Sequence, residues 1–172
     1  LSVGMQKMYR SDIGASGLMF TLDTESGFPV VVVIYVVWGL DEMIVQGEVT
    51  PDEFLVFKRT KAIIDKKVGP KTRKMIYGKR RPTEIVEVPQ KEAQSFVISN
   101  EEALKLAEWG MMIEEHYSAV HGKWTPMDME WAKDGETGKL LIVQARPETI
   151  HAGRDFTKVK EYIRKEDGKI LV

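Results

Sequence analysis

Four polar side chains late in the sequence are spaced so that they could form one binding surface. Asp128 and Glu130 are two residues apart, as are Gln144 and Arg146, and a glycine-bearing polar run separates the two pairs. Alternate residues of a β-strand point to the same face, so each pair shares a face of its strand. Carboxylates with an amide oxygen suit Mg²⁺, and arginine is a bidentate partner for phosphate. The pattern predicts a metal–polyphosphate site.

These residues belong to a predicted β-hairpin that spans Met127–Thr149. Its arms are Met127–Ala132 and Lys139–Arg146, and Lys133–Gly138 forms the turn. The face opposite the polar residues is expected to be core material: Met127, Met129, Trp131, Val143 and Ala145.

The cross-strand pairing depends on where the turn is centred. A centre near Thr137 places Glu130 opposite Gln144 and Asp128 opposite Arg146, whereas a slip of one residue breaks this pairing. The alternative interpretation is an exposed hairpin face whose ion pairs contribute little stability and bind nothing.

Composition excludes several classes of function. The chain has 172 residues, 43% hydrophobic and 30% charged, with a net charge of −1 and no cysteine, which rules out disulfides and thiolate chemistry. The longest apolar run, Val30–Trp38, is about half as long as a bilayer requires, so it is predicted to be a buried strand. The basic run Lys71–Arg81 is interpreted as solvated hairpin faces. We expect a cytoplasmic protein that contacts neither membrane nor nucleic acid.

Periodicity predicts an α+β fold with one long helix. The helix is expected over Ser99–Tyr117, where Ser99 and Glu102 form a capping box, and Met43–Gln46 forms a helical turn. The last four of the predicted strands are expected to form an antiparallel meander. These strands are Ser2–Tyr9, Leu18–Leu22, Val30–Trp38, Phe54–Lys58, Ala62–Lys67, Arg73–Tyr77 and Glu84–Val88.

An ordered set of motifs extends over Ser2–Ile150. The motifs are Met5-Gln6-Lys7-Met8, Ser16-Gly17-Leu18-Met19-Phe20-Thr21, Trp38-Gly39-Leu40 with Glu42, Val45-Gln46-Gly47, Pro51-Asp52-Glu53-Phe54, Asp128-Met129-Glu130-Trp131 and Val143-Gln144-Ala145-Arg146-Pro147-Glu148-Thr149. Together they resemble the ATP-grasp nucleotide-binding domain of the phosphoenolpyruvate synthases (pyruvate, water dikinases). The resemblance implies an ATP-grasp-like subdomain, a mainly antiparallel sheet with one long helix packed on it. Residues 1–150 would be the second ATP-grasp subdomain, and 151–172 a linker toward a phosphohistidine domain.

The resemblance also implies a role for each site residue. Arg146 is the catalytic, phosphate-contacting residue, and Glu130 and Gln144, with Asp128 nearby, are the Mg²⁺ ligands. The ATP contacts are expected from Arg146 together with Gln6, Lys7, Met8 and Glu42. The first three of these belong to the strand that borders the adenine.

The implied reaction needs parts that this chain does not contain. In the family, ATP phosphorylates a histidine on a swivelling domain, which then phosphorylates pyruvate in a barrel domain and yields phosphoenolpyruvate, AMP and phosphate. The chain has three histidines, His116, His121 and His151. None is surrounded by the glycine- and threonine-rich sequence that the family has around its phosphorylated histidine. We therefore expect the chain to contribute half of an ATP·Mg site. Without the first subdomain, the histidine domain and the barrel, it is expected to be inactive and to bind Mg·ATP weakly at most.

One departure from the family motif keeps two alternatives open. The family usually has Gly-Leu-Gly-Glu where this chain has Gly39-Leu40-Asp41-Glu42, so a carboxylate lies beside the expected nucleotide. One alternative is a non-catalytic nucleotide-binding or interaction module. The other is a related dikinase or phosphotransferase with a different acceptor.

Overall fold

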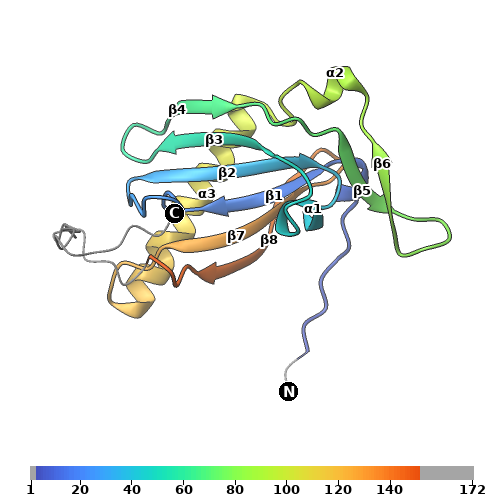
Figure 1. The fold of residues 1–172 in the computed structure, drawn as a ribbon. Helices are drawn as coiled ribbons and strands as arrows, with labels where there is room; N and C mark the ends of the chain where they lie inside the picture. The colour runs from blue at the N-terminus through green and yellow to red at the C-terminus, as the bar shows by residue number, and fades with distance from the viewer. Residues whose placement is uncertain (1–2, 152–172) are drawn as a thin grey trace, which may run out of the picture.

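A six-stranded sheet forms the body of the computed structural model, which describes residues 3–151 (Figure 1). The strand order is β4-β3-β2-β1-β7-β8 and every neighbouring pair is antiparallel. The strands are β1 (Ala15–Phe20), β2 (Val31–Trp38), β3 (Asp52–Phe57), β4 (Ala62–Lys67), β7 (Met127–Lys133) and β8 (Leu140–Pro147). A separate two-stranded sheet contains β5 (Arg73–Tyr77) and β6 (Thr83–Glu87). The helices are η1 (Ser11–Ile13), α1 (Glu42–Val45), α2 (Gln90–Ala93) and α3 (Asn100–His121). The predicted α+β fold is confirmed.

Helix α3 packs across one face of the sheet (Figure 1). Its buried residues Ala103, Leu106 and Ala107 join the main core, to which β2 contributes Val32, Ile34 and Val36. The face of the sheet opposite α3 is called the open face here. Because alternate residues of β2 point to opposite faces and nearly all are buried, the predicted central strand is confirmed.

The long helix begins where its capping box predicts and ends four residues later than expected. The Ser99 side chain accepts the Glu102 N–H, and the Glu102 carboxylate accepts the Ser99 N–H. The helix continues to His121 because the stop signal is Gly122, whose φ of 65° is the left-handed conformation that closes helices.

The predicted hairpin of β7 and β8 is confirmed, with a β-bulge that the sequence pattern did not indicate. The register shifts between Glu130 and Trp131, because Trp131 pairs with Ile142 and leaves Val143 without a partner in the register. Ile142 and Ala145 pack against the main core, whereas the predicted core residue Val143 is not part of that contact set.

Two predicted features of the remaining strands are wrong. Over 3–9, the described part of the predicted strand Ser2–Tyr9, no strand forms, and Figure 1 shows this segment running away from the sheet. Its alternating apolar residues, such as Met5 at 97% exposure, have no sheet edge to cover them. The predicted meander is also divided, because β4 pairs with β3 while β5 pairs with β6 in the second sheet.

The division of the meander changes the interpretation of the basic run. Lys71, the first residue of that run, is fully buried and paired with Asp52, so it is no part of a solvated face. Apart from His151, the predicted linker 151–172 lies outside the described residues. Within the described range, no helix combines the length and apolarity needed to cross a membrane.

Candidate functional site

The four predicted residues lie together on the open face of the β7–β8 hairpin. The observed register places Glu130 opposite Gln144 and Asp128 opposite Arg146, as predicted. These four residues are called the platform. Next to the turn, Lys133 pairs with Leu140, so the turn is centred slightly before Thr137. The bulge at Val143 then shifts the register by one residue and produces the predicted pairs.

An apolar strip borders the platform on the neighbouring strand. In the β1–β7 register, Leu18 lies opposite Glu130 and Phe20 opposite Asp128. Phe20 makes an edge-to-face contact with Tyr35 of β2, with ring centroids 6.3 Å apart. The open face thus combines an apolar floor with a polar edge, a combination common in small-molecule sites.

Arg146 and Asp128 form the ion pair of the platform. Arg146 Nε donates to Asp128 Oδ2 at 2.8 Å, and the arginine side chain is 63% exposed. The hydrogen bond and the charge of Asp128 raise the pKa of Arg146, which therefore stays cationic. Among the described residues, the terminal NH₂ groups of Arg146 donate no hydrogen bond, so they are available to an anion.

Glu130 and Gln144 form the second pair, in a more acidic environment. Gln144 Nε2 donates to Glu130 Oε1 at 3.4 Å, which leaves the amide oxygen for another partner. Burial raises the pKa of Glu130, and the charges of Asp41 and Asp128 raise it further against the opposing effect of Arg146. A bound cation would relieve this repulsion.

Asp41 is brought to the platform by the loop that follows β2. Gly39 has a φ of 77°, and a Cβ there would collide with the Met75 carbonyl oxygen, so this position requires glycine. The Ser16 hydroxyl donates to the Gly39 carbonyl at 2.6 Å in a buried contact. Asp41 is half-buried, and burial followed by the charge of Glu42 raises its pKa.

The hairpin turn is fixed by contacts with the residues before β1. Arg10 N–H donates to Asp134 Oδ1 at 2.9 Å, and Gly135 N–H donates to the Arg10 carbonyl at 3.0 Å. The Thr137 hydroxyl donates to Asp134 Oδ2, and this hydrogen bond is the main reason that the pKa of Asp134 is lowered. The turn therefore holds both arms of the platform in a defined position.

A cleft of about 520 Å³ lies at the Arg146 end of the platform. Arg146, Asp128, Phe20 and His151 are among its lining residues. The His151 ring contacts the Thr24 carbonyl through Nε2 at 3.0 Å, while its buried Nδ1 has no hydrogen-bond partner among residues 3–151. The sequence analysis did not place His151 at the site. The available signal was its position two residues after Thr149, the last residue of the motif that contains Arg146.

The structure does not bring every predicted nucleotide contact to the platform. Gln6, Lys7 and Met8 are exposed in the segment that leaves the sheet. Glu42 is exposed on α1 and accepts a hydrogen bond from Gln46 at 2.9 Å. Within the described range, no hydrogen bond or ion pair joins these four residues to β7 or β8, and their roles remain predictions.

The oxygen ligands of the platform suit a magnesium ion whose remaining coordination positions are filled by other ligands. Among the described residues, no group of three or more His, Cys, Asp or Glu side chains is arranged to hold a metal alone. Two carboxylates and the Gln144 amide oxygen are nevertheless the oxygen ligands that Mg²⁺ prefers, and this ion usually retains water and phosphate oxygens as further ligands.

Comparison with known proteins supports a nucleotide-binding fold. The family model described as "Pyruvate phosphate dikinase, AMP/ATP-binding domain" matches residues 1–167. The phosphoenolpyruvate synthase of Aquifex aeolicus is 56% identical over 168 residues, which cover 94% of this chain and 20% of that protein. Those of Synechocystis and Escherichia coli K12 are 49% and 46% identical, each with 22% of its length and 99% of this chain covered. The chain spans about a fifth of the length of these relatives. It therefore belongs to the pyruvate phosphate dikinase AMP/ATP-binding domain family.

Proposed function

We propose that this chain supplies one wall of the ATP·Mg site of a multidomain phosphotransferase of the phosphoenolpyruvate synthase type. In this proposal residues 1–150 are the second ATP-grasp subdomain, and 151–172 lead toward a phosphohistidine domain. The observation that carries it is the register of β7 and β8, which gathers two carboxylates, an amide oxygen and a guanidinium on one face. The full protein would convert ATP, pyruvate and water to phosphoenolpyruvate, AMP and phosphate in the cytoplasm.

Each platform residue has a distinct task in this reaction. Glu130 and Gln144, with Asp128 beside them, would hold Mg²⁺, which neutralises phosphate charge when bound. Arg146 would donate its terminal N–H groups to phosphate oxygens and stabilise the charge that develops during transfer. Asp128 accepts Arg146 Nε at 2.8 Å and thereby fixes the plane of the guanidinium.

The platform contains no phosphate acceptor in this proposal. Phosphoryl transfer depends mainly on positioning and charge stabilisation, which the four platform residues can supply. The opposite wall of the ATP site, the acceptor histidine and the pyruvate site would belong to other domains of the full protein.

The test uses the full-length protein that carries this chain. Glu130→Ala and Arg146→Ala are each expected to reduce ATP-dependent phosphorylation of the protein by about 100-fold or more, because each removes a group that contacts transferring charge. Lys139→Ala, in the exposed start of the second arm, is the matched control and should retain activity. Retained phosphorylation in both platform variants would refute the assignment.

A second candidate is a nucleotide-binding module without catalysis, and Asp41 favours it. Its carboxylate lies where the family usually has glycine, and its charge acts on Glu130. A carboxylate at this place repels polyphosphate. A full-length protein that binds Mg·ATP but shows no phosphorylation would establish this second function in place of the first.

A further inference from the structure

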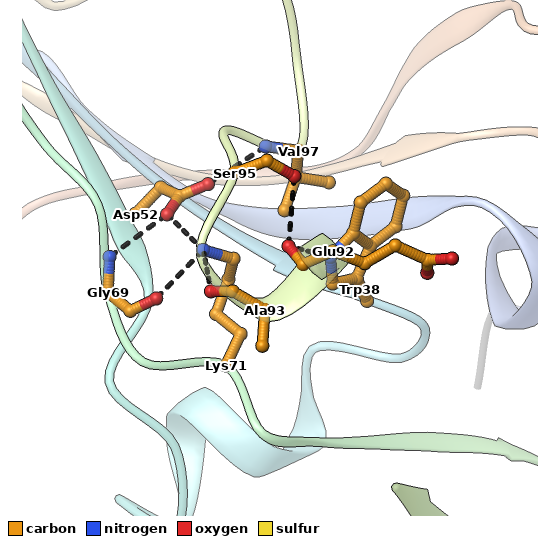
Figure 2. Close-up of polar contacts among 8 residues, drawn as sticks. All are labelled: Trp38, Asp52, Gly69, Lys71, Glu92, Ala93, Ser95 and Val97. Atoms are coloured by element: carbon orange, nitrogen blue, oxygen red, sulfur yellow. Dashed lines mark hydrogen bonds and ion pairs between the residues drawn. The ribbon is translucent and has the colours of Figure 1, made fainter. Parts of the chain in front are cut away.

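A buried ion pair outside the platform connects four distant parts of the chain (Figure 2). Lys71 and Asp52 both have zero exposure. Lys71 Nζ donates to Asp52 Oδ1, to the Gly69 carbonyl at 2.9 Å and to the Ala93 carbonyl at 3.4 Å. The Asp52 carboxylate also accepts the N–H groups of Gly69 at 3.0 Å and Val97 at 2.9 Å. All three ammonium hydrogens and both carboxylate oxygens have partners.

The network joins elements that no main-sheet ladder connects. Asp52 begins β3 in the main sheet, Lys71 precedes β5 in the second sheet, Ala93 ends α2, and Val97 precedes α3. The pair is therefore the point at which the second sheet and α2 are attached to the main sheet, and we call it the clasp.

Two of the attached elements hold the loop after β2. On one side, Leu40 N–H donates to the Met75 carbonyl of β5 at 3.0 Å, and Gly39 forms a parallel bridge with Met75. On the other side, Trp38 Nε1 donates to the Glu92 carbonyl of α2 at 3.5 Å, as Figure 2 shows. Residues 38–40 are thus supported from both sides.

The clasp lies close in the structure to both elements that support the loop, β5 and α2. Lys71 lies two residues before the start of β5 and four before Met75, and its Nζ donates directly to the Ala93 carbonyl at the end of α2. The supported loop is hydrogen-bonded to β1, because the Ser16 hydroxyl donates to the Gly39 carbonyl at 2.6 Å, and Ser16 lies opposite Ala132 of β7. The loop then leads into Asp41, whose charge acts on Glu130 of the platform. A displacement of β5 or α2 would therefore move the loop that lies beside the platform.

We propose that Lys71 and Asp52 are positioning residues that set the 38–41 loop against the platform and so define the space available to a nucleotide phosphate. This role rests on the function proposed above. Lys58 and Glu114 offer a matched comparison. They form a buried pair at 2.6 Å, with side-chain exposures of 14% and 10%, that joins the end of β3 to α3.

The test compares the double variant Asp52→Asn/Lys71→Met with the double variant Lys58→Met/Glu114→Gln in the 172-residue chain. The double variant removes both charges together, so no lone charge is left buried. Amide hydrogen exchange is measured by NMR for Leu40, whose partner is the Met75 carbonyl, and for Thr21, whose partner is the Met127 carbonyl at 3.0 Å. Mg·ATP affinity is then measured by titration calorimetry in the full-length protein that carries each set of substitutions.

The clasp variant is expected to speed Leu40 exchange about tenfold relative to Thr21, because the local opening of this loop becomes easier. Mg·ATP binding should weaken in parallel, and Lys58→Met/Glu114→Gln should change neither quantity. Unchanged relative exchange at Leu40, or an equal change in Lys58→Met/Glu114→Gln, would overturn the positioning role. A full-length protein without substitutions that does not bind Mg·ATP would instead refute the proposed function, and this outcome is distinguishable because the exchange measurement uses no ligand.

Discussion

Two pairs of a cation and an aspartate occupy opposite environments in this protein. The Lys71–Asp52 pair is fully buried, whereas in the Arg146–Asp128 pair the side chains are 63% and 15% exposed. In the buried pair, the three ammonium hydrogens and both carboxylate oxygens are hydrogen-bonded to protein groups. In the exposed pair, Nε is the one arginine donor that is hydrogen-bonded within residues 3–151, so the terminal groups remain for a ligand.

Unused hydrogen-bond donors distinguish a pair that can bind a ligand from a pair that only supports the fold. A buried charge must be fully satisfied, because water cannot replace a missing partner. An exposed pair contributes little to stability, and its open donors exchange water for a ligand at small cost. The fully satisfied pair is expected to govern folding and the partly satisfied pair to govern chemistry.

The largest expected effect is on stability and breaks the buried pair alone. Asp52→Ala leaves the Lys71 ammonium buried without its carboxylate, and the free energy of unfolding should fall by about 3–5 kcal/mol. Asp128→Ala should lower it by less than about 1 kcal/mol. Urea denaturation of both variants measures the difference. Similar losses would mean that the two pairs are energetically equivalent, contrary to the comparison.

The second largest effect is expected in the exposed pair, where a substitution should lower activity and leave stability nearly unchanged. Arg146→Lys keeps the positive charge but loses the planar fork that binds Asp128 and a phosphate together. ATP-dependent phosphorylation in the full-length protein should fall by about 10- to 100-fold, while the melting temperature stays within about 2 °C. Lys139→Arg serves as the control. Full activity in Arg146→Lys would show that charge alone suffices at this position.

The exposed pair was predictable from sequence because its information is local. Strand side chains alternate faces, and a glycine-bearing turn between two such runs limits the register to a few choices. The prediction that Asp128 faces Arg146 therefore needed only 20 or so consecutive residues, and even the unforeseen bulge at Val143 lies within that stretch. The capping box at Ser99 was predictable for the same reason.

The buried pair was not predictable, because its information is distributed over the fold. Lys71 belongs to a run of basic residues, and nothing in its neighbourhood distinguishes it from the exposed Arg80. Its burial results from contacts with Asp52 and Ala93, which are 19 and 22 residues away. The wrong strand over Ser2–Tyr9 has a related cause, since alternation predicts a strand without showing whether a neighbouring strand exists to pair with it.

A smaller effect concerns the loop that connects the two regions. Asp41→Gly removes a carboxylate from beside Glu130 and restores the residue that the family resemblance leads us to expect. Mg·ATP affinity of the full-length protein should rise several-fold, because like-charge repulsion at the phosphates decreases. Asp41→Asn keeps the size of the side chain and separates charge from space. Titration calorimetry measures both variants, and weaker binding in Asp41→Asn would show that Asp41 assists binding.

The smallest expected effect is the stability cost of the platform itself. Burial and the charges of Asp41 and Asp128 raise the pKa of Glu130 above its ordinary value of 4.5, so the folded state holds this proton more tightly than the unfolded state does. The resulting stabilisation is complete below pH 4.5 and is lost as the pH rises through the folded-state pKa. Neutral pH therefore destabilises the wild type relative to Glu130→Gln, which carries no charge at any pH.

Thermal unfolding without ligand tests this cost. Glu130→Gln should melt about 1–2 °C above the wild type at pH 7, and the difference should shrink toward zero near pH 4. Glu115→Gln, on an exposed position of α3, should show no such pH-dependent difference. A Glu130→Gln advantage that persists unchanged at pH 4 would come from the packing of the amide. A destabilised variant at pH 7 would mean that the Glu130 carboxylate supports the ligand-free fold, as the buried Asp52 does, and the contrast between the two regions would fail at this residue.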